Sequence, residues 1–193
     1  MTTAEYRRLV VADLWRIEGA YSWRRLVRHL TRGMAFKFIF WMRTSLYCRA
    51  GPVPARLLYP LARALYRHYM FKLGISIPYT TSIGPGLYIG HFGGIVVSGQ
   101  ARIGANCNLS QNVTIGGANR GTRAGVASLG DNVYVGPGAV VVGRVDIGNQ
   151  AAIGANAVVL DDVPEAGVVV GNPGRVVSHD GSSGYVNRTN YPQ

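Results

Sequence analysis

The 193-residue chain has few acidic residues and almost no cysteine. It carries 9 Asp or Glu against 20 Lys or Arg, which gives a formal net charge of +11. Its two cysteines, Cys48 and Cys107, exclude a disulfide framework and are typical of a cytoplasmic protein. No uncharged apolar run reaches the roughly eighteen residues of a membrane-spanning helix. Early acidic residues argue against a signal peptide, and no recognised motif indicates a nucleic-acid partner.

The basic excess lies entirely in the first part of the chain. Residues 1–75 hold 14 Lys or Arg and 3 Asp or Glu, whereas residues 76–193 hold 6 of each. A strongly basic segment favours an anionic partner, such as a membrane surface or an acidic substrate. We therefore divide the chain into a basic, apolar helical region at 1–75 and a second domain after it.

The second domain contains a six-residue period. Large aliphatic residues recur at every sixth position in three blocks: Leu129, Val135, Val141, Ile147, Ile153 and Val159; Val97, Ile103, Leu109 and Ile115; Ile83, Ile89 and Ile95. This period fits neither an amphipathic helix nor a single alternating strand. It predicts a parallel β-helix of about four coils over residues 76–178, in which stacked coils share one core. Cys107 falls at a small inward position and should be a buried filler.

Two interruptions of the period are the candidate functional places. The phase slips by two residues between Ile95 and Val97, just after residues 87–94 (LYIGHFGG). The spacing from Ile115 to Leu129 is fourteen instead of twelve, which predicts a loop over residues 116–128. Insertions in such repeats often collect on the binding face, although a tolerated surface loop is the simpler alternative.

The first 75 residues have a helical pattern over residues 3–18, 21–32, 34–43 and 54–73. Segment 34–43 is apolar nearly all round and must be buried in protein or lipid. In 54–73, where Pro60 should cause a kink, arginines lie opposite leucines: Arg56, Arg63 and Arg67 against Leu57, Leu58, Leu61 and Leu65. This favours an interfacial anchor on an anionic membrane, with helix packing as the alternative. The polar segment 179–193 should be a flexible tail.

Three segments carry a family resemblance: residues 90–97 (GHFGGIVV), 111–117 (QNVTIGG) and 171–177 (GNPGRVV). Together they resemble the serine acetyltransferase branch of the hexapeptide acyltransferases. The resemblance implies a left-handed β-helix, a homotrimer with active sites between neighbouring prisms, acetyl-CoA as co-substrate and no metal. It also implies that His91 is the general base, since a neutral imidazole can take the proton of an attacking hydroxyl.

The resemblance assigns further binding roles by position. Gly116, Gly117 and Ala155 would lie along the pantetheine arm, although plain repeat geometry explains them equally well. Pro173, Gly174 and Arg175 would meet the adenine and 3′-phosphate end, where an arginine suits a phosphate. Arg123 and Gln111 would contact the acceptor.

The chain departs from serine acetyltransferases where those enzymes hold serine. Their aspartate before the histidine is replaced by Gly90, a second one by Ser76, and the histidine of their loop by Ala124. We therefore expect a sugar acceptor instead of serine, as in colanic acid and capsule polysaccharide O-acetyltransferases. That acceptor would be a lipid-linked oligosaccharide at the inner face of the cell membrane. The alternatives are serine acetylation in cysteine biosynthesis and a catalytically dead trimeric scaffold.

Overall fold

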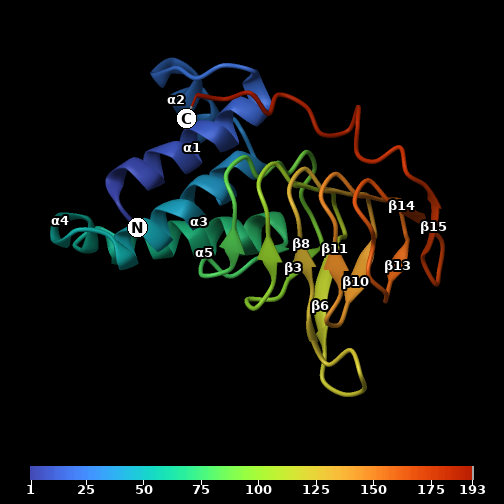
Figure 1. The fold of residues 1–193 in the computed structure, drawn as a ribbon. Helices are drawn as coiled ribbons and strands as arrows, with labels where there is room; N and C mark the ends of the chain where they lie inside the picture. Colours follow the sequence, from blue (N-terminus) through green and yellow to red (C-terminus); the bar gives the residue numbers. More distant parts are fainter. Residues whose placement is uncertain (193) are drawn as a thin grey trace.

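The computed structural model describes residues 1–192 and places a helical region at one end of a β-stranded prism (Figure 1). The helices are α1 (Thr3–Glu18), α2 (Trp23–Thr31), α3 (Ala35–Ala50), α4 (Val53–Arg56) and α5 (Tyr59–Leu73). A capping box starts α1, because Thr2 and Glu5 each accept a hydrogen bond from the other's backbone N–H. Gly19 ends that helix with a left-handed backbone (φ 69°), which glycine tolerates without strain.

The apolar segment predicted at 34–43 is buried in protein. It belongs to α3, whose Phe38, Ile39 and Met42 lie in the same core cluster as the prism residues. Pro60 does not kink a longer helix as expected. It occupies the first turn of α5, a position where a proline costs no intrahelical hydrogen bond, and the chain breaks into α4 and α5 before it.

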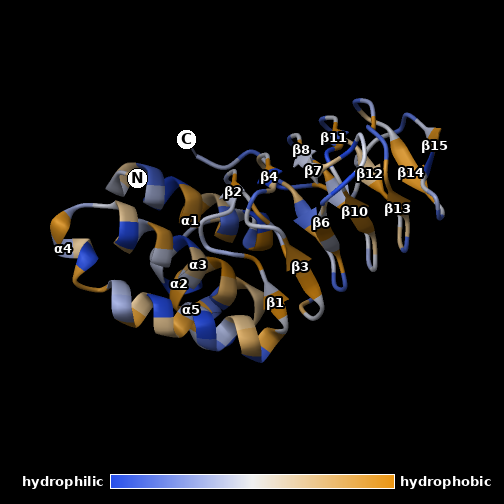
Figure 2. Cartoon of the chain, turned by 90° about the horizontal axis from the view of Figure 1, so that it is seen from below, coloured by the Kyte–Doolittle hydropathy of each residue, from blue (hydrophilic) through white to orange (hydrophobic). Residues whose placement is uncertain are grey.

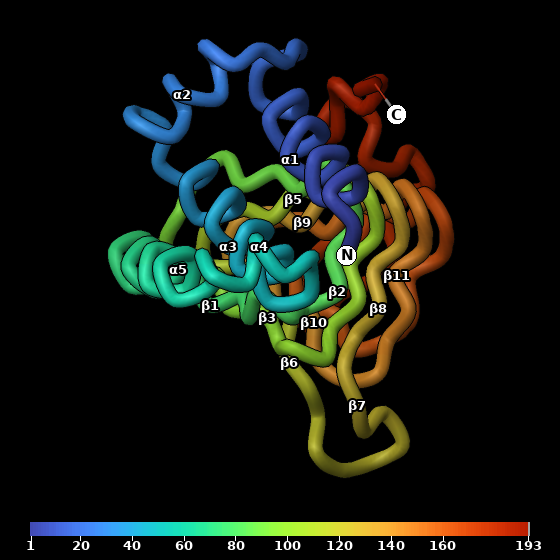
Figure 3. The backbone as a smooth tube through the Cα atoms, turned by 90° about the vertical axis from the view of Figure 1, so that its left-hand side faces the viewer, coloured from blue at the N-terminus to red at the C-terminus, as the bar shows by residue number. Residues whose placement is uncertain are grey.

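The prism is built from short strands in three sheets, parallel except where β15 pairs antiparallel with β14 and β7 pairs antiparallel with β6. One sheet has the order β1-β3-β6-β10-β13, the second β11-β8-β4-β2 and the third β15-β14-β12-β9-β5. The strand bounds are Ile75–Ser76, Ser82–Ile83, Ile95–Val97, Arg102–Ile103, Asn108–Leu109, Thr114–Ala118, Gly125–Val126, Ser128–Leu129, Tyr134–Val135, Val140–Val142, Asp146–Ile147, Ala152–Ile153, Val158–Val159, Val168–Val170 and Arg175–Ser178 for β1 to β15. Figure 3 looks along the stacked coils.

The register confirms the six-residue period. Val97 pairs with Ile115, and Val141 pairs with both Ile115 and Val159, so inward aliphatic residues stack from coil to coil. The first sheet has five parallel strands along its path, one more than the four coils we expected. Cys107 is buried as predicted, and burial raises the pKa of its thiol to about 12.

Several corners of the prism use left-handed residues other than glycine. Their φ angles lie between 56° and 59°, at Asn106, Asn112, Asn132, Gln150 and Asn156. Asparagine is the residue that best tolerates this region after glycine. The turns between coils are therefore encoded by asparagine as well as by the glycines of the repeat.

The predicted loop leaves the prism as a projecting hairpin (Figure 1, Figure 3). Strands β6 and β7 pair antiparallel, with Gly117 opposite Val126. In the turn that joins the two strands, Arg123 forms ion pairs with Asp162 at 2.6 Å and Asp161 at 3.4 Å. The insertion is therefore fastened to a later coil.

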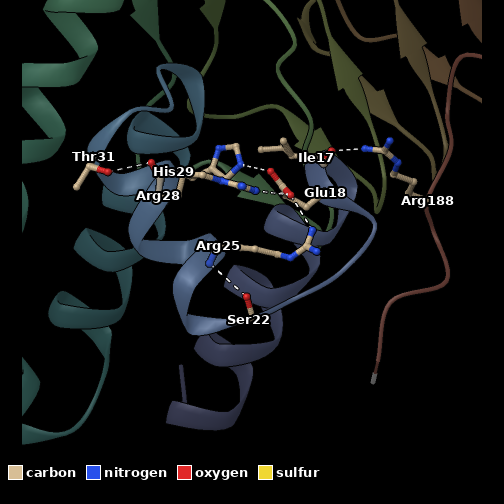
Figure 4. A network of polar contacts seen from close by, with 8 residues as sticks. All are labelled: Ile17, Glu18, Ser22, Arg25, Arg28, His29, Thr31 and Arg188. Carbon is tan, nitrogen blue, oxygen red and sulfur yellow. Dashed lines mark hydrogen bonds and ion pairs between the residues drawn. The ribbon is translucent and has the colours of Figure 1, made fainter.

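The C-terminal segment follows a defined path, and its flexibility stays a prediction. After β15 it runs back along the prism to α1 (Figure 1). The Ser182 N–H donates to the Gln150 carbonyl at 2.7 Å, and Tyr191 is buried. Arg188 donates to the Ile17 carbonyl beside a cluster in which Arg25, Arg28 and His29 surround Glu18 (Figure 4).

Candidate active site

His91 lies at a corner of the first coil, in the segment where the period slips. An isolated bridge from Tyr88 to Asn108 precedes it, and β3 follows it. Gly93 (φ 112°) and Gly94 (φ 64°) turn the chain between them, in conformations that L-residues avoid. A Cβ on Gly94 would also overlap the Asn112 side-chain oxygen. The glycines beside the histidine therefore serve the sharp turn that exposes its ring.

The imidazole borders a hollow of about 230 Å³. Its walls come from the first three coils and from the tail, at Tyr88, Gly90, His91, Asn108, Leu109, Ser110, Tyr134 and Tyr185. A larger hollow of about 710 Å³ lies on α1, where the one lining carboxylate, Glu5, already caps the helix. That hollow lacks a histidine or another base suited to an alcohol, so the smaller hollow at His91 is the candidate active site.

A hydrogen-bonded chain connects helix, strand and tail beneath this hollow. The buried Arg16 guanidinium donates to Asn108 Oδ1 at 2.6 Å and to the Asn106 carbonyl at 3.2 Å. Asn108 Nδ2 in turn donates to the Tyr185 carbonyl at 2.9 Å. Burial lowers the pKa of Arg16 from its ordinary value, yet a guanidinium stays charged at neutral pH. Asn108 is thus fixed from both sides.

The site has no acidic group. The sequence from Gly19 to Gly130 contains no Asp or Glu, and no carboxylate lines the hollow within residues 1–192. Over the same residues, no hydrogen bond reaches the His91 ring. The imidazole is therefore not oriented by an acid from its own chain, in keeping with Gly90 at the position before it.

The predicted acceptor residues lie outside this hollow. Gln111 directly follows Ser110, which lines it, whereas Arg123 is engaged with Asp161 and Asp162 at the hairpin. Their roles in acceptor binding stay predictions. Residues 1–192 contain no group of three or more His, Cys, Asp or Glu side chains placed to hold a metal ion.

The six predicted cofactor residues are spread along the prism. Gly116 and Gly117 lie on β6, and Ala155 lies exposed in the turn after β12. Gly174 and Arg175 line a small hollow at the far end together with Asp161 and Asp162, and Pro173 precedes them. None of the six lines the hollow at His91, and their assignment to the cofactor stays a prediction.

Five residues that build the hollow were not singled out from the sequence: Tyr88, Asn108, Tyr134, Ser110 and Tyr185. The first three hold outward positions on their coils, where a repeat leaves the residue type free. Tyr185 reaches the site only because the tail doubles back, and no local pattern predicts that path.

The family described as bacterial transferase hexapeptide (six repeats) matches residues 127–161. The serine acetyltransferase of Staphylococcus xylosus is 41% identical over 123 residues, which are 64% of this chain and 57% of that protein. The chain spans little more than half the length of such curated relatives.

Solved structures similar to this chain are serine acetyltransferases as well. The soybean serine acetyltransferase apoenzyme is 32% identical, with a TM-score of 0.72 over 90% of this chain and 69% of that one. A serine acetyltransferase in complex with CoA is 26% identical, with a TM-score of 0.70 over 91% of this chain and 71% of that one.

Stacked coils and the matched repeats define a hexapeptide-repeat transferase. Within that class, the chain belongs to the serine acetyltransferase family. The expectation of a sugar acceptor and of a closer kinship with polysaccharide O-acetyltransferases is wrong, because these relatives and structures are serine acetyltransferases. That expectation relied on the missing aspartates. The loss of a group that could pair with the serine ammonium does not by itself identify a different acceptor.

Proposed function

We propose that the chain transfers the acetyl group of acetyl-CoA to the hydroxyl of L-serine, with His91 as general base. The observation that carries the proposal is an exposed histidine at the mouth of a polar hollow in a chain of this family. Neutral imidazole would take the hydroxyl proton while the serine oxygen attacks the thioester carbonyl. The tetrahedral intermediate would then collapse, breaking the C–S bond, and the proton would pass from the imidazolium to the CoA thiolate.

Cofactor binding and assembly belong to the same proposal. Gly116, Gly117 and Ala155 would follow the pantetheine arm, and Pro173, Gly174 and Arg175 would meet the phosphorylated end. The CoA complex of a related serine acetyltransferase supports acetyl-CoA as the donor. We infer a left-handed coil and a homotrimer, as the family resemblance implies. The predicted cofactor residues do not line the hollow at His91 in the single chain, and a neighbouring prism would supply them.

The test is CoA release by purified protein supplied with acetyl-CoA and L-serine. We expect serine-dependent release, and a fall of 10²- to 10⁴-fold in kcat for His91→Ala, the usual contribution of a general base. His91→Asn is the matched variant, since it keeps a polar side chain without a base of suitable pKa. Serine-dependent release that is equal in wild type and both variants would contradict the assignment of His91. Release by the wild type no faster than without protein would favour the catalytically dead scaffold.

A second proposal concerns the outer face of α4 and α5, which we infer to meet an anionic membrane surface. Leu57, Leu58, Leu61 and Phe71 on this face are 58–80% exposed. Arg56, Arg67 and Lys72 are exposed beside them, and no acidic residue occurs between Val53 and Leu73. Figure 2 shows α4 and α5 at the end of the molecule opposite β15. Exposed leucines among cations suit the boundary of an anionic bilayer.

No helix within residues 1–192 is long and apolar enough to cross a bilayer. The proposal is therefore one of peripheral contact, and a cytoplasmic location at the inner face of the membrane stays a prediction. Sedimentation with phosphatidylglycerol vesicles tests it. Binding that weakens with salt and in Leu57→Ser/Leu61→Ser, but persists in the control Leu160→Ser on the prism, supports it. Protein that stays in the supernatant would overturn it.

A further inference from the structure

We infer that aromatic rings, chiefly that of Tyr185, bind the ammonium group of the serine acceptor in place of a carboxylate. This inference rests on the proposed serine acetyltransferase function and concerns the acceptor side of the same hollow. Its starting point is the lack of a carboxylate, since an ammonium ion that leaves water needs negative charge nearby. No Asp or Glu lines the hollow in the part of the chain described.

The tail holds Tyr185 in a built position. Ser182 is buried, and its hydroxyl donates to the Asn132 carbonyl at 2.5 Å. Asn108 Nδ2 donates to the Tyr185 carbonyl at 2.9 Å. The Tyr185 ring stacks on Tyr134 with centroids 4.4 Å apart and planes inclined by 21°. Three contacts from two coil segments therefore fix this ring at the hollow, although it belongs to a polar terminal segment.

The ring is fixed but not covered, because Tyr185 is 57% exposed. The negative face of an aromatic ring attracts a cation within about 6 Å of its centroid. Tyr134 lies on one face of Tyr185, and the exposure of Tyr185 leaves part of its surface accessible to a ligand. The π electrons of the Tyr185–Tyr134 pair thus provide a negatively polarised surface in a hollow that has no carboxylate.

Tyr88 is the weaker candidate of the three tyrosines. The Arg16 guanidinium lies 5.8 Å from the centroid of its ring, so Tyr88 already has a cation partner. Arg16 itself is engaged with Asn106 and Asn108 below the floor of the hollow. This leaves the Tyr185 ring as the aromatic surface free to take a second cation, the acceptor's ammonium.

The experiment compares two acceptors and two substitutions at Tyr185. L-serine and 3-hydroxypropionate share a hydroxyl and a carboxylate, but the second lacks the ammonium group. We expect Tyr185→Leu to raise KM for serine about 3- to 10-fold, while Tyr185→Phe stays within 2-fold of wild type because its ring face remains. KM for acetyl-CoA should stay unchanged in both variants. The kcat/KM for 3-hydroxypropionate should change less than 2-fold.

Ser182→Ala tests the anchoring of the tail. It loosens the segment that positions the ring, so it should raise KM for serine less than Tyr185→Leu does and leave kcat/KM for 3-hydroxypropionate within 2-fold of wild type. An equal loss for both acceptors in Tyr185→Leu would overturn the inference, as would an unchanged KM for serine. Wild-type protein that releases no CoA with serine would instead refute the proposed function, and this inference with it.

Discussion

Arg43 and Asp13, 30 residues apart in the sequence, form a buried ion pair with Nε and Oδ2 3.0 Å apart. Arg43 also donates to the Ile83 and Gly84 carbonyls, and the Leu87 N–H donates to Asp13 Oδ1. The pair thereby fastens α3 and α1 to the first coil, a few residues before His91. The helical region thus supports the first coil structurally, in addition to presenting the outer face of α4 and α5.

Removing one member of this pair should be costly. Asp13→Ala leaves the Arg43 charge buried with two carbonyl partners only, and the expected loss of unfolding free energy is about 3–5 kcal/mol. Urea denaturation measures it. Glu165→Ala, at an exposed turn of the prism, is the control and should stay within about 0.5 kcal/mol of wild type. Comparable values for the two variants would contradict the structural role of the pair.

Gly94 should not tolerate a side chain. Gly94→Ala places a Cβ at a left-handed φ and against Asn112, whereas Gly121→Ala has a similar φ of 83° in open space. Both substitutions carry the left-handed penalty of about 1–2 kcal/mol, so their difference isolates the overlap. We expect Gly94→Ala to be clearly the less stable in thermal unfolding and to lose CoA release. Equal melting temperatures would show that the turn at His91 has more room.

The cysteines should be inert in the folded protein. Burial raises the pKa of both thiols, to about 12 for Cys107, and the thiolate is the reactive form. Ellman's reagent at pH 8 should therefore detect almost no thiol before denaturant is added and two per chain afterwards. Rapid reaction of one thiol in the native protein would place that cysteine in an opened region.

The hairpin should loosen at acid pH. The backbone N–H of Asp146 and the Arg123 guanidinium hold the pKa of Asp162 below its ordinary value. This stabilisation is present above the unfolded pKa of about 3.9 and is lost as the pH falls through the folded pKa. Amide exchange in the hairpin, corrected for intrinsic rates, should increase below about pH 4. In Asp162→Asn, amide exchange in the hairpin should already be faster at pH 7. Exchange as slow as in wild type would show that this contact does not stabilise the hairpin.

The prism could be predicted from sequence because each inward position depends only on its own six-residue unit. Val135 and Ile153 face the core of their coils and must be apolar, so the six-residue period alone identifies these inward positions. His91 could be found for a similar reason, since it sits where the period breaks among glycines. Local pattern thus predicted the scaffold and drew attention to the segment that holds His91.

The acceptor side could not be predicted, because it depends on contacts between distant segments. Tyr185 meets Tyr134 only when the tail reverses along the prism, and Asn108 meets Arg16 only when α1 packs on the coils. The sequence shows that Gly90 replaces an aspartate. The consequence of this change for acceptor binding depends on the groups that surround the hollow, which the sequence does not reveal.

The most direct test of the account is mass spectrometry of the product formed from acetyl-CoA and L-serine. We predict O-acetylserine from wild-type protein, in amount equal to the CoA released, and its loss in His91→Ala. CoA released without O-acetylserine, or O-acetylserine formed equally well by the variant, would contradict it.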